Sequence, residues 1–145
     1  MKTKGTDYLI DGQYWDAIIW ALGAYQYSLV NGSDKQFMKI AQNALTTTFA
    51  KFEAEEYDPA DGLFRGGAVY ADGIAAYPDK YANGPNSGIE GWLENPANDP
   101  LKADTGRGLP MKALSTNCTY YQAYVILGKF NKMLNIDSTD ADTKA

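Results

Sequence analysis

The side-chain types that bind sugars lie together in one stretch of this chain, GLFRGGAVYADGIAAYPDKY, at residues 62–81. Aromatic rings cover the apolar faces of a pyranose, while carboxylates and arginine form hydrogen bonds with its hydroxyls. The stretch supplies the rings of Phe64 and Tyr77, the guanidinium of Arg65 and the carboxylate of Asp72. These residues predict a carbohydrate site in the middle of the chain.

Asp72 has sequence neighbours that suit the acid catalyst of glycoside hydrolysis. That reaction uses two carboxyl groups, one protonated and one ionised. A poorly hydrated environment raises the pKa of a carboxyl group and keeps it protonated, and Asp72 lies between Ala71 and Gly73 with Tyr70 nearby. Asp-Gly is also a common turn pair, and on composition alone a simple turn is the more frequent role of such a pair.

A second set of candidates lies in the stretch QYWDAIIW, which places Tyr14, Trp15 and Asp16 in the first turn of a helix. Side chains at such an end can reach a pocket at the mouth of the helix. Asp16 equally suits the positive end of the helix dipole, an interaction worth up to about 1 kcal/mol. The sequence alone leaves both interpretations open.

Two further candidates also have a structural alternative. Arg65 can clamp a hydroxyl or a carboxylate, or it can pair with Asp58 or Asp61 and hold the loop. Asn117 can line the pocket, but in the run STN at residues 115–117 it is also expected to act as an N-cap.

The elements that must position these residues begin with three helices. Apolar residues recur at helical spacing over residues 14–30, 34–55 and 115–134. Ser33 and Gln36 predict a capping box at the start of the second helix. The short link before it makes the first two helices an antiparallel hairpin.

The first helix is apolar nearly all round, so it is expected to be buried on several sides. Its large residues fall on one face, Trp15, Ile18, Ile19, Leu22 and Leu29, and its small ones on the other, Ala17, Ala21, Ala24 and Ser28. Further along the chain, the glutamates at 53, 55 and 56 are expected to be solvated. The polar tail DSTDADTKA is expected to fray.

A long loop at residues 57–110 separates the second helix from the third. It contains all 6 prolines of the chain, which exclude a long helix. Its aromatic residues favour an ordered, functional loop over a flexible linker. The sequence thus predicts an all-α fold, a helical hairpin plus a third helix with a long ordered loop, in one segment covering residues 1–145.

Composition excludes several classes of protein. The net charge of -5 and the absence of a Lys/Arg run argue against nucleic acid. No apolar run reaches membrane-spanning length, and residues 1–12 lack the apolar stretch of a signal peptide. With no histidine and one cysteine, Cys118, His-based triads, His-ligated zinc and an internal disulfide are excluded. We expect no metal or cofactor, and we expect Cys118 to be a small buried residue.

Three stretches together resemble a known family: YWDAIIWALGAYQYSLVNGSDKQF, DGLFRGGAVYADGIAAYPDKY and GLPMKALSTNCTYYQAY. In this order, they look like the six-hairpin (α/α)6 glycosidases, in the bacterial branch related to family 63 of the glycoside hydrolases, with glucosidases and mannosylglycerate hydrolase-like enzymes. The resemblance covers about residues 8–134. It implies a toroid of helical hairpins, with the active site in a funnel at one end.

The resemblance also implies roles for individual residues. Asp72 matches the general acid, Trp15 and Asp16 match residues that grip the sugar beside the scissile bond, and Phe64 and Arg65 match loop residues around that subsite. Such enzymes usually invert configuration, with an oligosaccharide or α-linked glycoside as substrate. A periplasmic or secreted bacterial parent protein is expected.

The chain departs from the family pattern in its number of helices. A toroid needs about twelve helices, and the sequence predicts three; the family's catalytic base, a glutamate from a later hairpin, has no visible counterpart. We therefore expect a partial segment whose reading frame continues into more hairpins, and an isolated chain that self-associates through apolar helix faces. The alternatives are a noncatalytic carbohydrate-binding module and a helical interaction domain.

Overall fold

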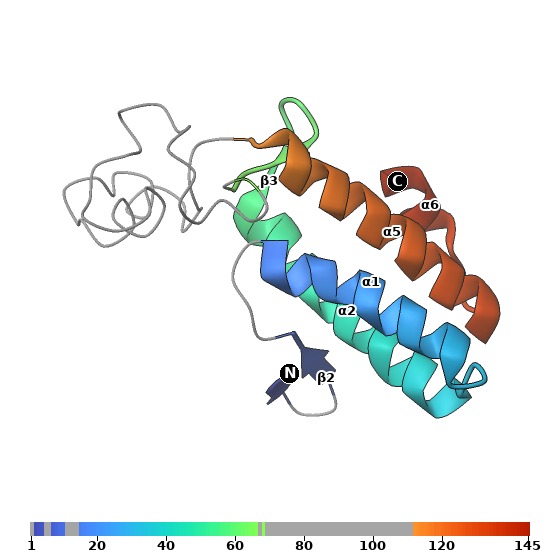
Figure 1. The fold of residues 1–145 in the computed structure, drawn as a ribbon. Coiled ribbons are helices and arrows are strands. Elements are labelled where there is room, and N and C mark those ends of the chain that lie inside the picture. The colour runs from blue at the N-terminus through green and yellow to red at the C-terminus, as the bar shows by residue number, and fades with distance from the viewer. Residues whose placement is uncertain (1, 5–6, 11–14, 67, 69–111) are drawn as a thin grey trace.

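Three long helices form the body of the protein (Figure 1). A computed structural model describes residues 2–4, 7–10, 15–66, 68 and 112–145, and the side chains of residues 2–4 and 15–17 lie outside this description. The helices are α1 (Trp15–Val30), α2 (Lys35–Glu56) and α5 (Leu114–Leu134). Each begins and ends within one residue of the range predicted for it. The helical class is confirmed.

Two short antiparallel β-hairpins accompany the helices in the described residues. β1 (Lys2–Lys4) pairs with β2 (Asp7–Leu9), and β3 (Tyr57–Asp58) pairs with β4 (Leu63–Phe64). The first hairpin docks on α2, where the amide of Tyr8 donates to Asn43 Oδ1 at 2.9 Å and that of Ile10 to Thr48 Oγ1 at 3.1 Å.

The start of α2 corrects the predicted capping box. The N-cap residue is Asp34, whose Oδ1 accepts hydrogen bonds from the amides of Gln36 at 2.8 Å and Phe37 at 3.4 Å. Ser33 instead adopts a left-handed conformation with φ of 57° in the link between α1 and α2. A side-chain oxygen at the N-cap accepts hydrogen bonds from backbone amides of the first turn that have no partner within the helix. The cap therefore lies at Asp34, one residue later than predicted.

The buried face of α1 differs from the expectation of burial on several sides. Its small residues, together with Ile18, face the core: Ala21, Ala24 and Ser28 are at most 5% exposed. Leu22 and Leu29 are 42% and 51% exposed. Small side chains let neighbouring helices approach closely, which explains why this side packs inward. The described part of the protein therefore leaves a large apolar face of α1 uncovered.

The core fills the space between the three long helices. Its largest fully buried side chains include Tyr120, Ile126 and Phe130 of α5, Leu45 of α2 and Ile18 of α1. Edge-to-face contacts join the two aromatic ones to neighbouring rings, Phe130 to Tyr25 at 6.0 Å and Tyr120 to Phe52 at 6.3 Å between ring centroids. A fully buried Phe such as Phe130 typically contributes about 3–5 kcal/mol when compared with Ala.

The C-terminal tail is ordered, and the prediction that it frays is wrong. Asn135 ends α5 in the left-handed conformation (φ 58°), and α6 (Thr139–Lys144) turns back along α5. Ala141 is 2% exposed, and Lys132 pairs with Asp142 at 3.0 Å. Burial of one small apolar residue and this ion pair fix a segment whose composition alone looks unstructured.

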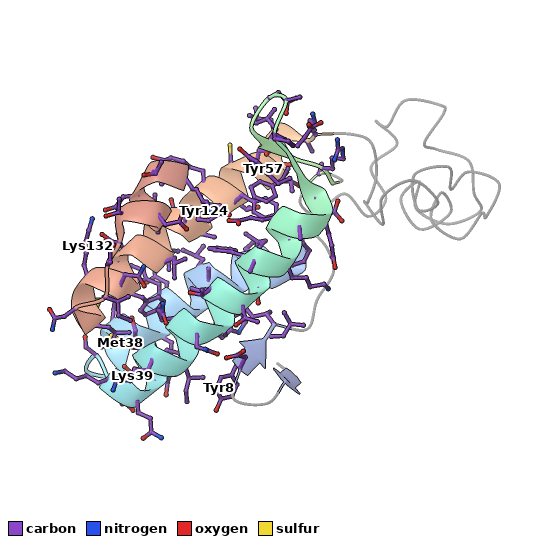
Figure 2. The ribbon with its side chains drawn as sticks, turned by 180° about the vertical axis from the view of Figure 1, so that it is seen from behind. Tyr8, Met38, Lys39, Tyr57, Tyr124 and Lys132 are labelled. Carbon is purple, nitrogen blue, oxygen red and sulfur yellow. The ribbon has the colours of Figure 1, made fainter. Side chains whose placement is uncertain are left out.

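Two other expectations also change. Glu56 is 6% exposed, and Glu53 is half-buried, so the acidic end of α2 is not simply solvated. Cys118 is exposed rather than buried. No helix among the described residues has the length and hydrophobicity needed to cross a membrane. Figure 2 shows that Tyr57 and Tyr124 lie close together at the end of α2.

Candidate functional site

The residues predicted to form the site fall into three groups. Outside the described residues lie Tyr14, Asp72 and Tyr77. In the first turn of α1, with side chains that are not described, lie Trp15 and Asp16. Fully described are Phe64, Arg65 and Asn117.

The β3–β4 hairpin positions Phe64 and Arg65 directly beyond the end of α2. The sequence between the strands, Pro-Ala-Asp-Gly, is typical of a turn. Asp58 Oδ1 accepts from the amide of Ala60 at 3.1 Å, and Gly62 adopts φ of 73°, a conformation that glycine reaches without strain. The chain therefore reverses at once and returns Arg65, whose amide donates to the carbonyl of Glu56 at 2.8 Å.

An ion cluster fastens this hairpin to the segment that precedes α5. Asp58 Oδ2 lies 2.6 Å from Arg65 Nη2 and 2.8 Å from Lys112 Nζ, and Lys112 also pairs with Asp61 at 2.5 Å. The hydrogen bond from Lys112, followed by that from the amide of Ala60, lowers the pKa of Asp58 to about 2. The hydrogen bonds to Asp58 and Asp61 raise the pKa of Lys112. Asp58 and Lys112 therefore both stay ionised at neutral pH.

Two backbone links reinforce the cluster. Gly66 and Lys112 form a parallel β-bridge. The amide of Phe64 donates to Asn117 Oδ1 at 2.8 Å, and Asn117 Nδ2 donates to the carbonyl of Phe64 at 3.0 Å. Both ends of the segment 67–111 thus leave from one end of the helices, and α1 also begins at that end (Figure 1).

Asn117 therefore ties the hairpin to α5 instead of capping the helix. Helix α5 begins at Leu114, with Ala113 at the N-cap position and no side-chain cap. Asn117 Nδ2 also donates to the carbonyl of Ala113 at 3.0 Å. The prediction that residues 115–117 cap the helix is wrong, because the helix begins at Leu114 and these residues already lie inside it.

Arg65 has the structural one of its two predicted roles, and its role as a clamp for a ligand stays a prediction. Its Nη2 pairs with Asp58, as the structural alternative predicted. Its Nη1 is buried and has no hydrogen-bond partner among the described residues. Leaving a buried donor unsatisfied costs about 1–3 kcal/mol. Nη1 is therefore a buried donor whose hydrogen-bonding capacity is not used by the described residues.

Phe64 packs into the core at this end. It is 6% exposed and stacks on Tyr120, with ring centroids 3.7 Å apart and planes at 4°. The Tyr120 hydroxyl is buried without a hydrogen-bond partner in the described part of the chain, and burial, followed by the charges of Glu56 and Glu55, raises its pKa. The Phe64 ring is thus buried against Tyr120 and Tyr57, which leaves little of its area for contact with a ligand.

Lys112 is the residue of this site that the sequence did not reveal. It is a single basic residue in the run GLPMKAL, with no periodic or motif signal. The one available signal was the excess of carboxylates near Arg65, since Asp58 and Asp61 need more than one cation between them. No group of three or more His, Cys, Asp or Glu among the described residues is arranged to hold a metal ion.

Comparisons with protein-family models, with curated proteins and with solved structures found no match for this chain. Its function is therefore argued from the residues and geometry of the site.

Proposed function

We propose that the chain is a segment of a six-hairpin (α/α)6 glycoside hydrolase that supplies the general acid and the sugar-binding residues. The observation that carries the proposal is the buried, unpartnered Nη1 of Arg65 at the end of the helices where α1 begins. A guanidinium held on one side by Asp58 presents its remaining donors in a fixed direction. Such a preorganised donor suits a sugar hydroxyl.

The arrangement of the helices supports the toroid. Helices α1 and α2 form a hairpin, and α5 packs against both of them. Residues 17–30 of α1 carry no charged side chain, whereas α2 has one polar face. In a toroid, uncharged helices form the inner row and amphipathic helices form the outer row. By this criterion we assign α1 to the inner row and α2 to the outer row. We assign α5 to the inner row because it is the next helix along the chain after an outer one.

In the proposed reaction, Asp72 donates a proton to the oxygen of the leaving group. Arg65 Nη1 donates a hydrogen bond to a hydroxyl of the ring, and Trp15 and Asp16 hold the sugar next to the scissile bond. Tyr77 contributes a further aromatic contact. An inverting reaction also needs a base that activates water across the ring, with the two carboxyl groups about 6.5–9.5 Å apart; that base is assigned to another hairpin of the toroid.

Two measurements test the proposal. Titration with methyl glucosides and mannosides should quench tryptophan fluorescence, and Arg65→Leu should weaken that binding. Hydrolysis of the same glycosides, by this chain together with the remaining hairpins, should fall about 10²–10⁴-fold in Asp72→Asn because the proton donor is lost. Asp79→Asn, in the same segment, is the matched control and should keep its activity. Full activity of Asp72→Asn would contradict the assignment.

A helical interaction domain is the second candidate, and a specific observation favours it. Leu22, Tyr27, Leu29 and Val30 of α1 are between 42% and 81% exposed. Apolar patches of this kind often mark binding surfaces. Absence of any sugar-dependent fluorescence change, combined with concentration-dependent association, would favour this candidate. Sugar binding without turnover, even with the remaining hairpins present, would favour a noncatalytic carbohydrate-binding module.

A further inference from the structure

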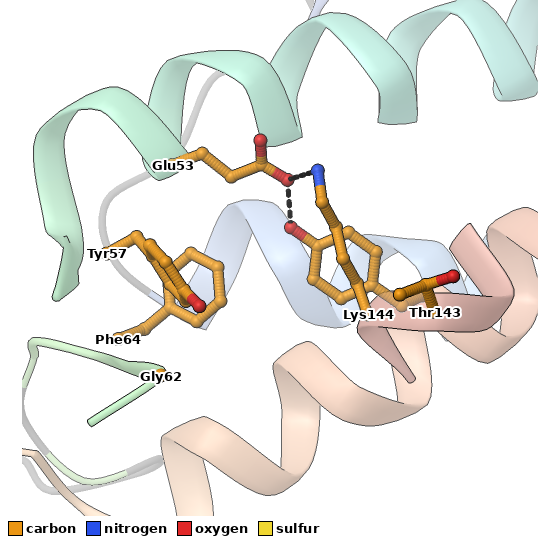
Figure 3. Close-up of a pocket in the computed structure, with 7 residues that line it drawn as sticks. Glu53, Tyr57, Gly62, Phe64, Thr143 and Lys144 are labelled. Atoms are coloured by element: carbon orange, nitrogen blue, oxygen red, sulfur yellow. Dashed lines mark hydrogen bonds and ion pairs between the residues drawn. The ribbon is translucent and has the colours of Figure 1, made fainter. Parts of the chain in front are cut away.

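A cavity of about 400 Å³ lies between the end of α2, the β3–β4 hairpin, α5 and α6 (Figure 3). Its size is at the lower end of the range of about 300–1,000 Å³ for small-molecule pockets. The lining side chains used below are Glu53, Tyr57, Phe64, Tyr124, Thr143 and Lys144. A smaller hollow of about 150 Å³ adjoins it, since both are lined by Gly62, Phe64, Tyr124 and Lys144.

One wall of the cavity is aromatic and held in place. Tyr57 is 36% exposed, and its ring packs on that of Phe64 with centroids 5.2 Å apart at 59°. Phe64 is itself stacked on Tyr120. A half-exposed ring supported by other rings offers apolar area to a ligand at little cost in side-chain entropy.

The opposite side of the cavity is polar and only partly satisfied. Glu53 Oε1 accepts hydrogen bonds from the Tyr124 hydroxyl and from Lys144 Nζ, the latter at 2.7 Å. In the described part of the chain, Glu53 Oε2 and the Tyr57 hydroxyl have no hydrogen-bond partner. Thr143 Oγ1 donates to the carbonyl of Thr139 at 2.8 Å, which leaves its acceptor capacity free. Donors and acceptors are therefore both available to a ligand.

The charges in the cavity favour a neutral ligand. Glu53 and Lys144 neutralise each other, and Asp140 lies 3.2 Å from Lys144 on the exposed side. Burial lowers the pKa of Lys144, but its hydrogen bonds to Glu53 and Asp140 outweigh burial and raise that pKa overall, so the ammonium stays charged at neutral pH. The ammonium of Lys144 repels a cationic ligand, and the carboxylates of Glu53 and Asp140 repel an anionic one.

We propose that this cavity binds one neutral sugar ring, with Tyr57 against its apolar face and Glu53, Thr143 and Lys144 on its hydroxyls. A hydroxyl both donates and accepts, which matches the mixture of free donors and acceptors here. The choice of a sugar among neutral polar rings rests on the proposed glycosidase function. The site itself is formed by other residues than Trp15, Arg65 and Asp72, and sugar binds it whether or not those residues bind sugar.

The test is a titration of the ¹⁵N-labelled full chain with methyl α-D-glucopyranoside and methyl α-D-mannopyranoside, followed by amide chemical shifts. We expect at least one of the two to shift the amides of Tyr57, Gly62, Thr143 and Lys144. The uronic acid of the glucoside differs from it by one carboxylate, and we expect it to bind at least several-fold more weakly because Glu53 and Asp140 repel it.

Variants assign the contacts. Tyr57→Ala should weaken binding about tenfold because the apolar face of the sugar loses its aromatic wall, while Tyr57→Phe should weaken it less. Lys144→Met keeps the length of the side chain but removes its donors, and it should also reduce affinity. Tyr27→Ala removes a tyrosine of α1 that is 53% exposed and should leave the affinity unchanged.

The outcomes separate this site from the proposed active site. Shifts at Tyr57 and Lys144 that persist in Arg65→Leu and Asp72→Asn support the cavity, even if no hydrolysis is found. Chemical-shift changes confined to Arg65, Asn117 and the tryptophan indoles would overturn the proposed cavity site while supporting the proposed active site. Absence of any shift at Tyr57 and Lys144 with both glycosides would also overturn it, as would equal affinity of the folded Tyr57→Ala variant.

Discussion

Asn117 satisfies both backbone polar groups of Phe64, a residue 53 positions earlier in the chain. Its Oδ1 accepts from the Phe64 amide and its Nδ2 donates to the Phe64 carbonyl, as a neighbouring strand would. Strand β4 of the β3–β4 hairpin thereby acquires a partner from the first turn of α5. This contact fixes Phe64, and Arg65 after it, relative to the helices.

The first prediction concerns this contact. Asn117→Leu should lower the free energy of unfolding by about 1–3 kcal/mol because two half-buried backbone groups of Phe64 lose their partners. Asn117→Asp keeps the acceptor but loses the donor, so its free energy of unfolding should lie between those of Asn117→Leu and the parent chain. Urea unfolding at pH 7 measures the change. Gln122→Leu, at an exposed position of the same helix, serves as control; a loss for Asn117→Leu no greater than for this control would contradict the contact.

The second prediction concerns the pH dependence that Asp58 confers. Its pKa is about 2 in the folded protein against an ordinary value of 3.8. The folded state therefore holds the proton more weakly than the unfolded state. The resulting stability is fully present above about pH 4 and is lost as the pH falls towards 2.

Asp58→Asn should flatten that part of the profile. Urea midpoints between pH 2 and pH 5 should decline less steeply in the variant than in the parent chain. Parallel curves for Asp58→Asn and the parent would show that the ion cluster has no such effect.

The third prediction concerns the uncovered face of α1. The isolated chain should self-associate with increasing concentration because Leu22 and Leu29 expose apolar area. The double variant Leu22→Lys/Leu29→Lys should be monomeric and should change the free energy of unfolding by only about 0.5 kcal/mol, as expected for exposed sites. Sedimentation velocity at several concentrations measures the association state of the parent chain and of the double variant. A single sharp monomer boundary for the parent chain at high concentration would contradict this prediction.

The fourth prediction concerns alkaline pH. Burial, followed by the hydrogen bond to Glu53, raises the pKa of Tyr124, and burial raises that of Tyr120. In the unfolded chain a tyrosine ionises near pH 10. Stability is thus fully present below that pH and is lost above it, because only the unfolded state releases these protons readily.

Tyr124→Phe removes one of these groups together with its hydrogen bond to Glu53. At neutral pH it should lower the free energy of unfolding by about 1–2 kcal/mol, and above pH 10 its stability should fall less steeply than that of the parent. Urea unfolding from pH 8 to pH 11 measures both effects. Tyr27→Phe, at a half-exposed tyrosine, should match the parental slope. Equal slopes in Tyr124→Phe and the parent would contradict the role of Tyr124.

The sequence predicted the three long helices because their signals are local. Apolar spacing and the break at Asn31–Gly32 set the ends of α1 and α2 without reference to the rest of the chain. The error at the capping residue is also local, since Ser33 and Asp34 are both good caps. Backbone conformation, which places Ser33 in the left-handed region, decides between them.

The faces of the helices were harder to predict than their ends. A helix such as α1, apolar on all sides, gives no polar stripe that shows which side faces solvent. Large residues such as Leu22 normally mark the core, yet Ala21 and Ser28 are buried because α2 and α5 approach closely there.

Much of the candidate site depends on contacts between residues far apart in the chain. Lys144 pairs with Glu53 across 91 positions, and Lys112 reaches Asp58 across 54. No local pattern encodes such pairs. The alternative partner proposed for Arg65, Asp58, was found because the two lie 7 positions apart. The role of Asp72 stays a prediction, since it lies outside the described residues.

The bridge between Gly66 and Lys112 has a consequence for how this protein tolerates change. Adjacent strands lie about 4.8 Å apart, so the two ends of residues 67–111 nearly meet, and a few glycines would span them. The helices and the two short hairpins are thus held together on both sides of residues 67–111 without depending on the length of that segment. Since the entropy of closing a loop grows only slowly with its length, connections of different length between Gly66 and Lys112 should have little effect on the stability of the helices.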